Sequence, residues 1–281
     1  MFSVFVVNIS DQLMIDTHAH LDFKDFDKDR EEVIARFFSR GGKAIINIGV
    51  DLESSRQSIE IAKKNKNIFA SVGLHPDFFS KAEKDLRFTI YDLRKLAKQK
   101  KVVAVGETGL DYFSHTDILI TNKQKEDQKN GFLAQIEIAQ ELNLPIIVHC
   151  RDAWNDVFDI INLKSKIINQ KFVLHCYSGG KKDTKKFLKL PNVYFSFSGN
   201  ITYPKPKERH EKLAEAVRMI SLDKIMLDSD APFLAPQEMR GKRNEPSFIR
   251  YIAEKIAEIK KISVDKIEKA TDETAESFFS I

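Results

Sequence analysis

The chain lacks several features that would have pointed to particular classes of protein. It has only two cysteines, Cys150 and Cys176, and neither belongs to a CxxC pair. This argues against zinc fingers, iron–sulfur clusters and a secreted disulfide scaffold, and two free thiols favour a reducing, cytoplasmic location. Glycine (11 residues) and proline (8 residues) are scarce, which excludes collagen-like and low-complexity chains. No apolar run approaches about 18 residues and no basic leader precedes the first apolar stretch, so neither a membrane helix nor a signal peptide is expected.

What the chain does have is enough apolar material for a packed core. Of its 281 residues, 42% are hydrophobic and 31% are charged, and the formal net charge is only +4. This composition is typical of a folded globular protein rather than a disordered one. No linker rich in glycine, serine or proline interrupts it, so we predict one domain over residues 1–281.

Short aliphatic or β-branched runs recur along the chain, and most end in a polar cluster. Near-continuous apolar runs of this length are typical of parallel strands that are buried on both faces. They are Met14–Thr17, Ala44–Val50, Ile68–Leu74, Val102–Gly106, Ile146–His149, Phe172–His175, Val193–Ser198 and Ile225–Leu227.

Amphipathic stretches with helical spacing lie between these runs, including Arg30–Arg40, Phe132–Leu142 and Phe248–Ile259. Eight strands alternating with helices predict an α/β protein with a (β/α)8 TIM barrel. The alternative is an open doubly wound sheet, which is disfavoured because no glycine-rich phosphate loop follows the first strand. Residues 112–128 are expected to form a long connection, and residues 260–281 a terminal helical wrapping.

Histidines gather at the ends of the predicted strands. His18 and His20 are two residues apart, so strand alternation places both on one face. His149 and His175 each end a later strand. In a barrel of this kind, the carboxyl ends of the strands meet at the active-site mouth.

Two carboxylates occupy equivalent places, Glu107 after the fourth strand and Asp230 after the eighth. A single buried histidine is more often a hydrogen-bonded core residue than a ligand, so no one of these residues is decisive. Together, however, four imidazoles and two carboxylates would be costly to bury without a metal. Nitrogen and oxygen donors without thiolate suit zinc, manganese or magnesium, and six donors suit two divalent ions bridged by a carboxylate.

These residues lie in segments that resemble the TatD family of metal-dependent hydrolases, which are amidohydrolase-like barrels. The resemblance runs from about residue 14 to 246, and residues 1–13 have no counterpart, so we treat them as an N-terminal extension. The matching segments are Met14–Asp22, Val72–Pro76, Val105–Tyr112, Gln128–Phe132, Pro145–Ala153, His175–Gly179, Phe195–Gly199, Asp228–Leu234 and Arg240–Asn244.

The resemblance implies a TIM barrel and a divalent-metal-dependent deoxyribonuclease, a 3′ to 5′ exonuclease on single-stranded DNA. A metal-activated water would be the nucleophile, and RNA stays open as a substrate. The implied ligands of two ions (Mg²⁺, Mn²⁺ or Zn²⁺) are His18, His20, Glu107, His149, His175 and Asp230. Glu107 would bridge the ions.

The chain departs from the family pattern in two places. Asp228-Ser229-Asp230 stands where the family usually has Glu-Thr-Asp, so the ligand is kept but a neighbouring contact is lost or remade. Thr274-Ala275 stands where the family usually has Asn-Phe, and this difference involves none of the predicted metal ligands.

Further roles follow for residues near the mouth. Glu107 and Asp230 are the predicted catalytic residues, with Asp230 orienting the water or taking its proton. His75 is assigned to substrate phosphate, although it could equally be a capping residue before Pro76. Arg151 could bind phosphate bidentately or hold Asp152 or Glu107 in place. Tyr112 is assigned to the substrate as an aromatic surface for an unpaired base.

Other residues add weaker expectations. Cations follow the sixth, seventh and eighth strands, on the side from which a polyanion would approach. They are Lys181, Lys182, Lys185, Lys186, Lys205, Lys207, Arg209, Arg240, Lys242 and Arg243. Phe113, Tyr177, Tyr203 and Phe233 are further stacking or packing aromatics. Cys150 and Cys176 are expected to point away from the barrel interior as small buried residues.

Three functions compete at this point. The first is the metal-dependent nuclease, expected to be a monomer with no obligate protein partner and no membrane. The second is an ester or amide hydrolase with the same ligands, such as a D-aminoacyl-tRNA deacylase, because an ion pair polarises a carbonyl as readily as a phosphoryl group. The third is a non-catalytic protein that keeps a metal for stability.

Overall fold

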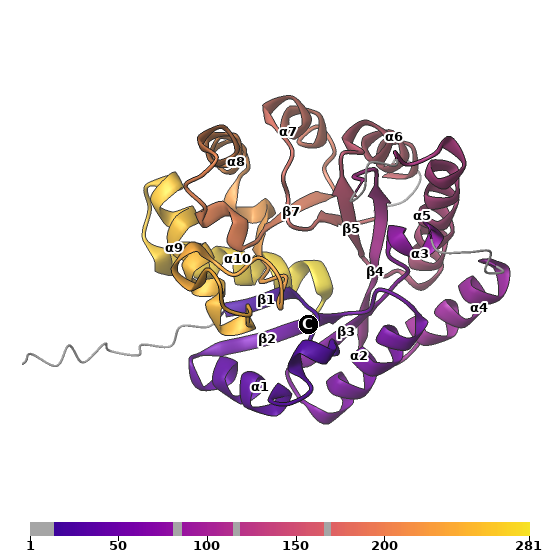
Figure 1. Cartoon of the computed structure of the whole chain (residues 1–281), viewed down its shortest axis with the longest axis horizontal. Coiled ribbons are helices and arrows are strands. Elements are labelled where there is room, and N and C mark those ends of the chain that lie inside the picture. The colour runs from indigo at the N-terminus through magenta and orange to yellow at the C-terminus, as the bar shows by residue number, and fades with distance from the viewer. Residues whose placement is uncertain (1–13, 81–85, 115–118, 166–169) are drawn as a thin grey trace, which may run out of the picture.

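A computed structural model describes residues 14–80, 86–114, 119–165 and 170–281. The N-terminal extension lies outside these residues. Eight parallel strands pair in sequential order, from β1 with β2 to β7 with β8. Helices surround them in the outer ring that Figure 1 shows. The predicted (β/α)8 barrel is therefore confirmed, and the sequential order excludes the doubly wound alternative.

The strands lie close to the predicted runs, apart from a longer fourth strand. Their bounds are β1 Met14–Ala19, β2 Gly42–Ile48, β3 Ile68–Val72, β4 Val102–Asp111, β5 Ile146–Arg151, β6 Phe172–Leu174, β7 Val193–Phe197 and β8 Ile225–Leu227. The helices are α1 Arg30–Ser39, α2 Leu52–Lys64, α3 Pro76–Ser80, α4 Leu86–Ala97, α5 Asn122–Leu142, α6 Trp154–Ser165, α7 Lys181–Phe187, α8 Lys207–Met219, α9 Ile249–Lys260 and α10 Val264–Phe279.

The connection after the fourth strand differs from the prediction, because much of it is helical. Helix α5 begins at Asn122, and Thr121 caps it: the Thr121 hydroxyl accepts from the Gln124 N–H while the Gln124 side chain accepts from the Thr121 N–H. This reciprocal pair is a capping box. The Thr-x-x-Gln pattern is present in the sequence, and the predicted long connection over residues 112–128 is shorter than expected because α5 begins at Asn122.

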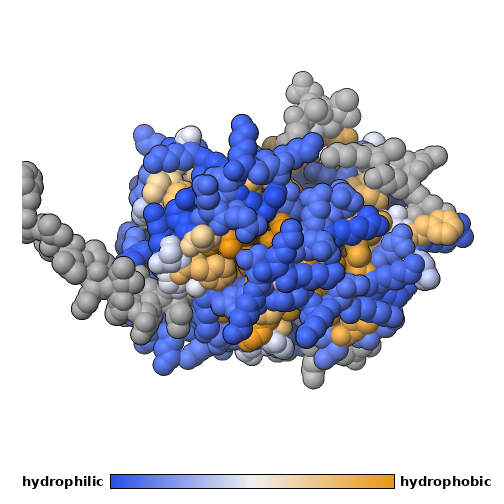
Figure 2. All heavy atoms as spheres, turned by 90° about the horizontal axis from the view of Figure 1, so that it is seen from below, coloured by the Kyte–Doolittle hydropathy of each residue, from blue (hydrophilic) through white to orange (hydrophobic). Residues whose placement is uncertain are grey.

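Strand alternation builds two apolar layers. Ile46, Ile147 and Met226 point into the barrel interior, where they form one buried cluster. Ile45, Val148 and other residues of the opposite strand face pack under the helices in a second cluster. In the view of Figure 2, hydrophilic residues cover most of the surface and apolar side chains show only between them. Within the described ranges, no helix has the length and apolar character needed to cross a membrane.

Helix α10 closes one end of the barrel. Its Ala275, Phe278 and Phe279 belong to the interior cluster, together with Ile15 of β1. Ala275 stands where the family usually has phenylalanine, and it is fully buried at this contact. Asp272 of α10 also accepts a hydrogen bond from the Ile15 N–H (2.8 Å). The predicted terminal wrapping is therefore a helix that packs across the strands and completes the core.

Opposite this helix, hydrogen bonds at the mouth join the end of β1 to the segment that follows β8. The Asp230 N–H donates to the His18 carbonyl (2.9 Å), and the His20 N–H donates to the Ala231 carbonyl (2.8 Å). Asp16 adds a side-chain link, since its carboxylate accepts from the Ser229 hydroxyl (2.6 Å) and the Ser229 N–H (2.9 Å). The segments that carry two predicted ligands are thus tied directly to each other.

The buried carboxyl of Asp272 predicts a pH-dependent cost to stability. Burial, the largest influence, raises the pKa of Asp272 to about 7 in the folded protein, despite the hydrogen bond from Ile15. In the unfolded chain an aspartate ionises near pH 3.9, so unfolding releases a proton between about pH 4 and 7, and rising pH destabilises the fold over that range. The asparagine side chain of Asp272→Asn does not ionise, so the stability of the variant should not fall in this way. Between pH 4 and 7.5, the free energy of unfolding of Asp272→Asn should therefore rise relative to that of the wild type by about 1–4 kcal/mol.

Thermal or urea unfolding at several pH values measures this difference. Glu273→Gln, at an exposed position of the same helix, is the matched control and should follow the wild type. If the free energies of unfolding of the wild type and Asp272→Asn differ by the same amount at every pH from 4 to 7.5, the raised pKa of Asp272 is contradicted.

Candidate metal centre

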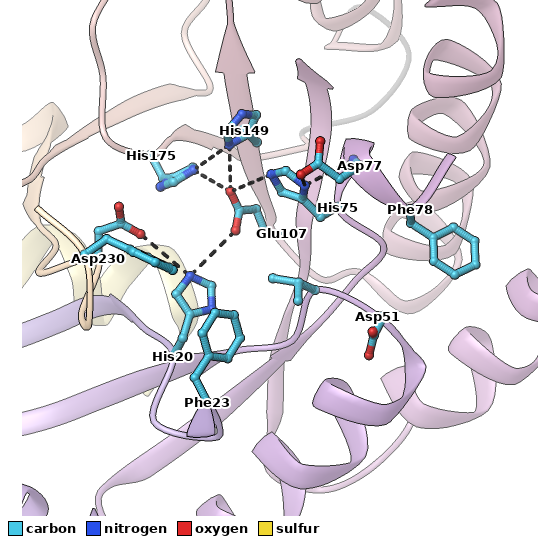
Figure 3. Close-up of a pocket in the computed structure, with 12 residues that line it drawn as sticks. His20, Phe23, Asp51, His75, Asp77, Phe78, Glu107, His149, His175 and Asp230 are labelled. Atoms are coloured by element: carbon cyan, nitrogen blue, oxygen red, sulfur yellow. Dashed lines mark hydrogen bonds and ion pairs between the residues drawn. The ribbon is translucent and has the colours of Figure 1, made fainter. Parts of the chain in front are cut away.

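The structure brings all six sequence-predicted ligands to one place at the mouth of the barrel. Figure 3 shows five of them, from five different segments, pointing toward one another around Glu107. Their potential ligand atoms form overlapping groups, each within 4.8 Å. The groups are His18 with His20 and Glu107, His18 with His175 and Asp230, Glu107 with His149 and His175, and His75 with Asp111 and His149.

A β-bulge in β1 aims the first two histidines. Ile15 faces the barrel interior, so strict alternation would put Thr17 and Ala19 inside as well. The pairing with β2 instead shifts register between Asp16 and Ala19. The extra residue reverses the alternation, so that His18 and His20 face the mouth while Ala19 packs in the outer cluster.

A second register shift places Glu107. Ala104 faces the interior, and the pairing of β4 with β5 shifts between Val105 and Thr108. Gly106 adopts a φ of +142°, and a Cβ there would lie 2.5 Å from the Ile147 carbonyl oxygen. Only glycine tolerates both conditions, so Gly106 is what lets β4 turn the Glu107 side chain inward.

The two oxygens of Glu107 face two different sets of donors. Oε1 lies 2.7 Å from His175 Nε2 and 2.8 Å from His149 Nδ1. Oε2 lies 3.5 Å from His18 Nε2 and 3.9 Å from His20 Nε2. The carboxylate of Glu107 therefore lies between two groups of histidines.

Asp230 completes the second set. Its Oδ1 lies 3.6 Å from His20 Nε2 and 3.9 Å from His18 Nε2, on the same side as Glu107 Oε2. Asp230 adopts a φ of +54°, in the left-handed region that aspartate tolerates better than most residues. The carboxylate therefore turns back toward β1 directly after the end of β8.

The histidines are oriented from behind by oxygen acceptors. His20 Nδ1 lies 3.2 Å from the Ile48 carbonyl oxygen, which leaves Nε2 for the centre. His149 Nε2 lies 3.0 Å from Asp111 Oδ2, which leaves Nδ1 for the centre. Such partners fix the tautomer and the ring orientation of a ligand histidine. Asp111 was not singled out from the sequence, because the predicted fourth strand stopped before it.

The cluster favours ionised carboxylates. Burial, the largest influence, opposes the charge on Glu107, but the charges of His175 and His75 and the hydrogen bonds from His149 and His175 outweigh it. The pKa of Glu107 therefore lies well below its ordinary value. Burial also opposes charge on His149, yet its bonds to Asp111 and Glu107 raise its pKa to about 10. For His18, burial and the nearby His175 lower the pKa.

Asp228 shows how the departure from the family pattern is accommodated. Its buried carboxylate accepts from the Cys176 N–H (2.9 Å) and from the hydroxyls of Ser196 and Ser198. The shorter side chain thus has a full set of donors on β7 and on the turn after His175.

The other predicted site residues divide into two groups. His75 and Arg151 line cavities beside the centre, and His75 Nε2 lies 3.7 Å from Glu107 Oε1. Tyr112 is not brought into the site: its hydroxyl donates to Asp156 (2.7 Å), and it lines neither cavity. Tyr177 is fully buried and bonded to Thr184, so it offers no exposed ring for stacking.

The cysteines also differ from each other. Cys150 is buried in the outer cluster, as predicted. Cys176 lies beyond the end of β6 with a φ of +43°, belongs to neither apolar cluster, and lines one cavity together with Cys150. Strand alternation does not extend past a strand end. Burial raises the pKa of both thiols well above the usual value, which disfavours a thiolate nucleophile.

Several of the cations expected to attract a polyanion have partners within the chain. Arg243 forms a bidentate pair with Asp29 and lies over the Phe26 ring. Lys181 pairs with Glu215, and Lys207 with Glu211 at 3.6 Å. Exposed pairs of this kind contribute little to stability. Their main effect is to reduce the positive charge that these loops present.

The donor set fits divalent cations. It consists of buried imidazoles and carboxylates without thiolate, a chemistry that suits zinc, manganese or magnesium. His18 Nδ1 and His175 Nδ1 are buried and have no hydrogen-bond partner among the residues that the structure describes. Buried polar atoms without a partner are costly, and a bound cation would give the donors of this cluster a partner that their own contacts do not supply.

Known proteins place the chain in one family. A sequence model of the family described as TatD related DNase matches residues 15–280. The uncharacterized metal-dependent hydrolase YabD of Bacillus subtilis (strain 168) is 37% identical over 271 residues, covering 96% of this chain and all of the relative. The 3′-5′ ssDNA/RNA exonuclease TatD of Erwinia amylovora is 31% identical over 274 residues, covering 95% of this chain and all of the relative.

A solved structure agrees with these relatives. The crystal structure of YJJV, a TatD homologue from Escherichia coli K12, superposes with a TM-score of 0.84 at 26% identity, covering 95% of this chain and 98% of that one. The barrel, the cluster of donors at its mouth and the match over nearly the whole chain agree: the protein belongs to the TatD family of metal-dependent hydrolases.

Proposed function

We propose that this hydrolase removes nucleotides from the 3′ end of single-stranded DNA or RNA with the help of two divalent ions. The observation that carries the proposal is that the two oxygens of Glu107 face different histidines: Oε1 lies near His149 and His175, and Oε2 lies near His18 and His20. The donor groups overlap at the centre, and together they would hold two ions that share Glu107. The name of the Erwinia relative supports the polarity and the substrate.

Two such ions would make a phosphodiester more electrophilic and water more acidic, and both effects assist hydrolysis. Asp230 supplies the carboxylate that orients the attacking water and accepts its proton. It is suitably placed, because it borders both cavities and its side chain is 14% exposed. His75 and Arg151 hold the phosphate from opposite cavities, His75 by a single nitrogen and Arg151 by two parallel N–H groups.

The proposal includes a cytoplasmic monomer with no protein partner needed for activity. The competing ester or amide hydrolase would use the same donors, so activity assays must separate the two. Because the donor set is complete, we expect turnover rather than a purely structural metal.

Replacing Glu107 should remove both ions. Wild-type protein should carry about two divalent ions per chain, measured by mass spectrometry of metals after gel filtration. Glu107→Gln should retain less than half of that content, because both donor sets lose an anionic oxygen. Glu31→Gln, at an exposed position of α1, should keep the wild-type content. Retention of both ions by Glu107→Gln would rule out the bridge.

Replacing Asp111 should lower the affinity of one metal site while leaving all of its ligands in place. Asp111→Asn keeps the size of the side chain but loses the charge that faces His149 Nε2. Loss of such a partner typically costs about 10–100-fold in metal affinity or activity. Titration of metal-free protein should show one site weakened and the other near its original affinity. Equal weakening of both sites, or of neither, would contradict this role.

Activity should appear as stepwise shortening from the 3′ end. A 5′-labelled single-stranded DNA with Mg²⁺ or Mn²⁺ should give a ladder of shorter products that EDTA abolishes. Asp230→Asn should lower kcat by at least about 100-fold, given the usual contribution of general acid–base groups. Release of amino acid from D-aminoacyl-tRNA with the DNA left intact would instead establish the competing hydrolase.

A further inference from the structure

Two cavities flank the centre and share part of their walls. One has a volume of about 390 Å³ and the other about 350 Å³. Both are bordered by His149, His175, Asp230 and Phe233. A phosphodiester held at the centre has a nucleoside on each side, so the two cavities can receive the two sides of the cleaved bond.

The cavities differ in charge. The first, which we name the acidic cavity, adds Asp51 and Asp77 to the shared wall, and no lysine or arginine among the described residues lines it. Figure 3 shows Asp77 beside His75, with Asp51 at the far side. The second, which we name the arginine cavity, adds Arg151 and Arg209.

Apolar and neutral groups reinforce the contrast. Of the two cavities, Phe23 borders only the acidic one, and its ring centroid lies 6.0 Å from that of Phe233, which borders both cavities and is 50% exposed. Aromatic faces of this kind stack on unpaired bases. The arginine cavity instead contains the polar side chains of Ser178 and Asn200. The acidic cavity thus suits a nucleoside, and the arginine cavity suits a phosphate-bearing chain.

Asp77 is well placed to distinguish the two ends of a strand. Its side chain is about half exposed, its Oδ2 lies 3.7 Å from His75 Nδ1, and its N–H donates to the same nitrogen (3.2 Å). A carboxylate at this position accepts a hydrogen bond from a hydroxyl group but repels a phosphate. Near a protein surface, two like charges repel each other more strongly than they do in bulk water.

We propose, on the basis of the exonuclease function above, that this charge difference selects the 3′ end. The terminal nucleoside with a free 3′-hydroxyl enters the acidic cavity. The remaining strand lies in the arginine cavity, where its next phosphate lies against Arg209. A strand that ends in a 3′-phosphate is rejected by Asp77, and so is a strand that continues beyond the terminal nucleotide. Asp77 is thus a specificity-determining residue.

The proposal also fixes which bond breaks. Water adds to phosphorus, the bond from phosphorus to the O3′ of the remaining strand breaks, and the proton lost by the water ends on that O3′. The products are a nucleoside 5′-monophosphate and a strand that again ends in a 3′-hydroxyl. Cleavage on the other side of phosphorus would leave a 3′-phosphate, which the acidic cavity would reject in the next round.

The test compares two 5′-labelled oligonucleotides of one sequence, one ending in a 3′-hydroxyl and one in a 3′-phosphate. Metal-loaded wild type should degrade the phosphorylated strand at least about tenfold more slowly, which corresponds to about 1.4 kcal/mol. The penalty should shrink as salt rises, because exposed charges are screened. The released nucleotides should carry 5′-phosphate.

Variants separate the two cavities. Asp77→Asn should reduce the preference for a 3′-hydroxyl by at least about threefold, chiefly through faster turnover of the phosphorylated strand. Arg209→Ala should raise KM for both strands by a similar factor and flatten the salt dependence of binding, as expected for a phosphate contact. Asp159→Asn on α6 and Arg218→Ala on α8 are exposed matched controls and should behave like the wild type.

The outcomes distinguish this inference from the proposed function. If both strands are shortened at equal rates and Asp77→Asn changes nothing, end selection by the acidic cavity is wrong while the exonuclease function stands. Release of nucleoside 3′-monophosphates would overturn the assignment of the bond. If neither strand is cleaved and fluorescence anisotropy detects binding of neither, both the proposed function and the inference fail.

Discussion

The centre depends on one carboxylate that serves two groups of histidines at once. Burying Glu107 without positive partners would be very costly, and the imidazoles around it are what make its ionised form favourable. The dependence is mutual, because closely spaced imidazoles also need a negative charge between them. This shared electrostatic requirement, more than any single contact, draws the ends of β1, β4, β5 and β6 toward a common point.

The groups behind the centre matter because they hold its donors in place. The Ile48 carbonyl orients the ring of His20, and Asp111 orients the ring of His149. Asp228 holds the turn that directly follows His175. None of these groups needs to touch substrate. Rigid placement of the donors lowers the cost of organising a site when ions or substrate bind, which is why such partners are usually as informative as the ligands themselves.

Much of this was predictable because the signals are strong and local. Apolar runs located the strands to within a few residues, and the order of polar residues at their ends predicted the gathering of donors. Alternation alone placed His18 and His20 on the same face of the strand. It did not place that face inside the barrel, because Ile15 faces the interior and strict alternation from Ile15 would turn both histidines outward. The answer came from a bulge, which depends on how β1 pairs with β2 and leaves no clear pattern in the sequence. Tyr112 and Cys176 lie beyond the ends of β4 and β6, where strand periodicity no longer indicates the direction of a side chain.

The closure of β1 against β8 has a consequence for the life of the chain. Donors of the centre come from residue 18 to residue 230, and the Asp230 N–H bonds directly to the His18 carbonyl. Domains emerge from the ribosome amino-terminal end first, at about 5–20 residues per second. For most of its synthesis, the nascent polypeptide therefore holds an incomplete donor set, and hydrolytic competence arrives late, once β8 has emerged and joined the first strand.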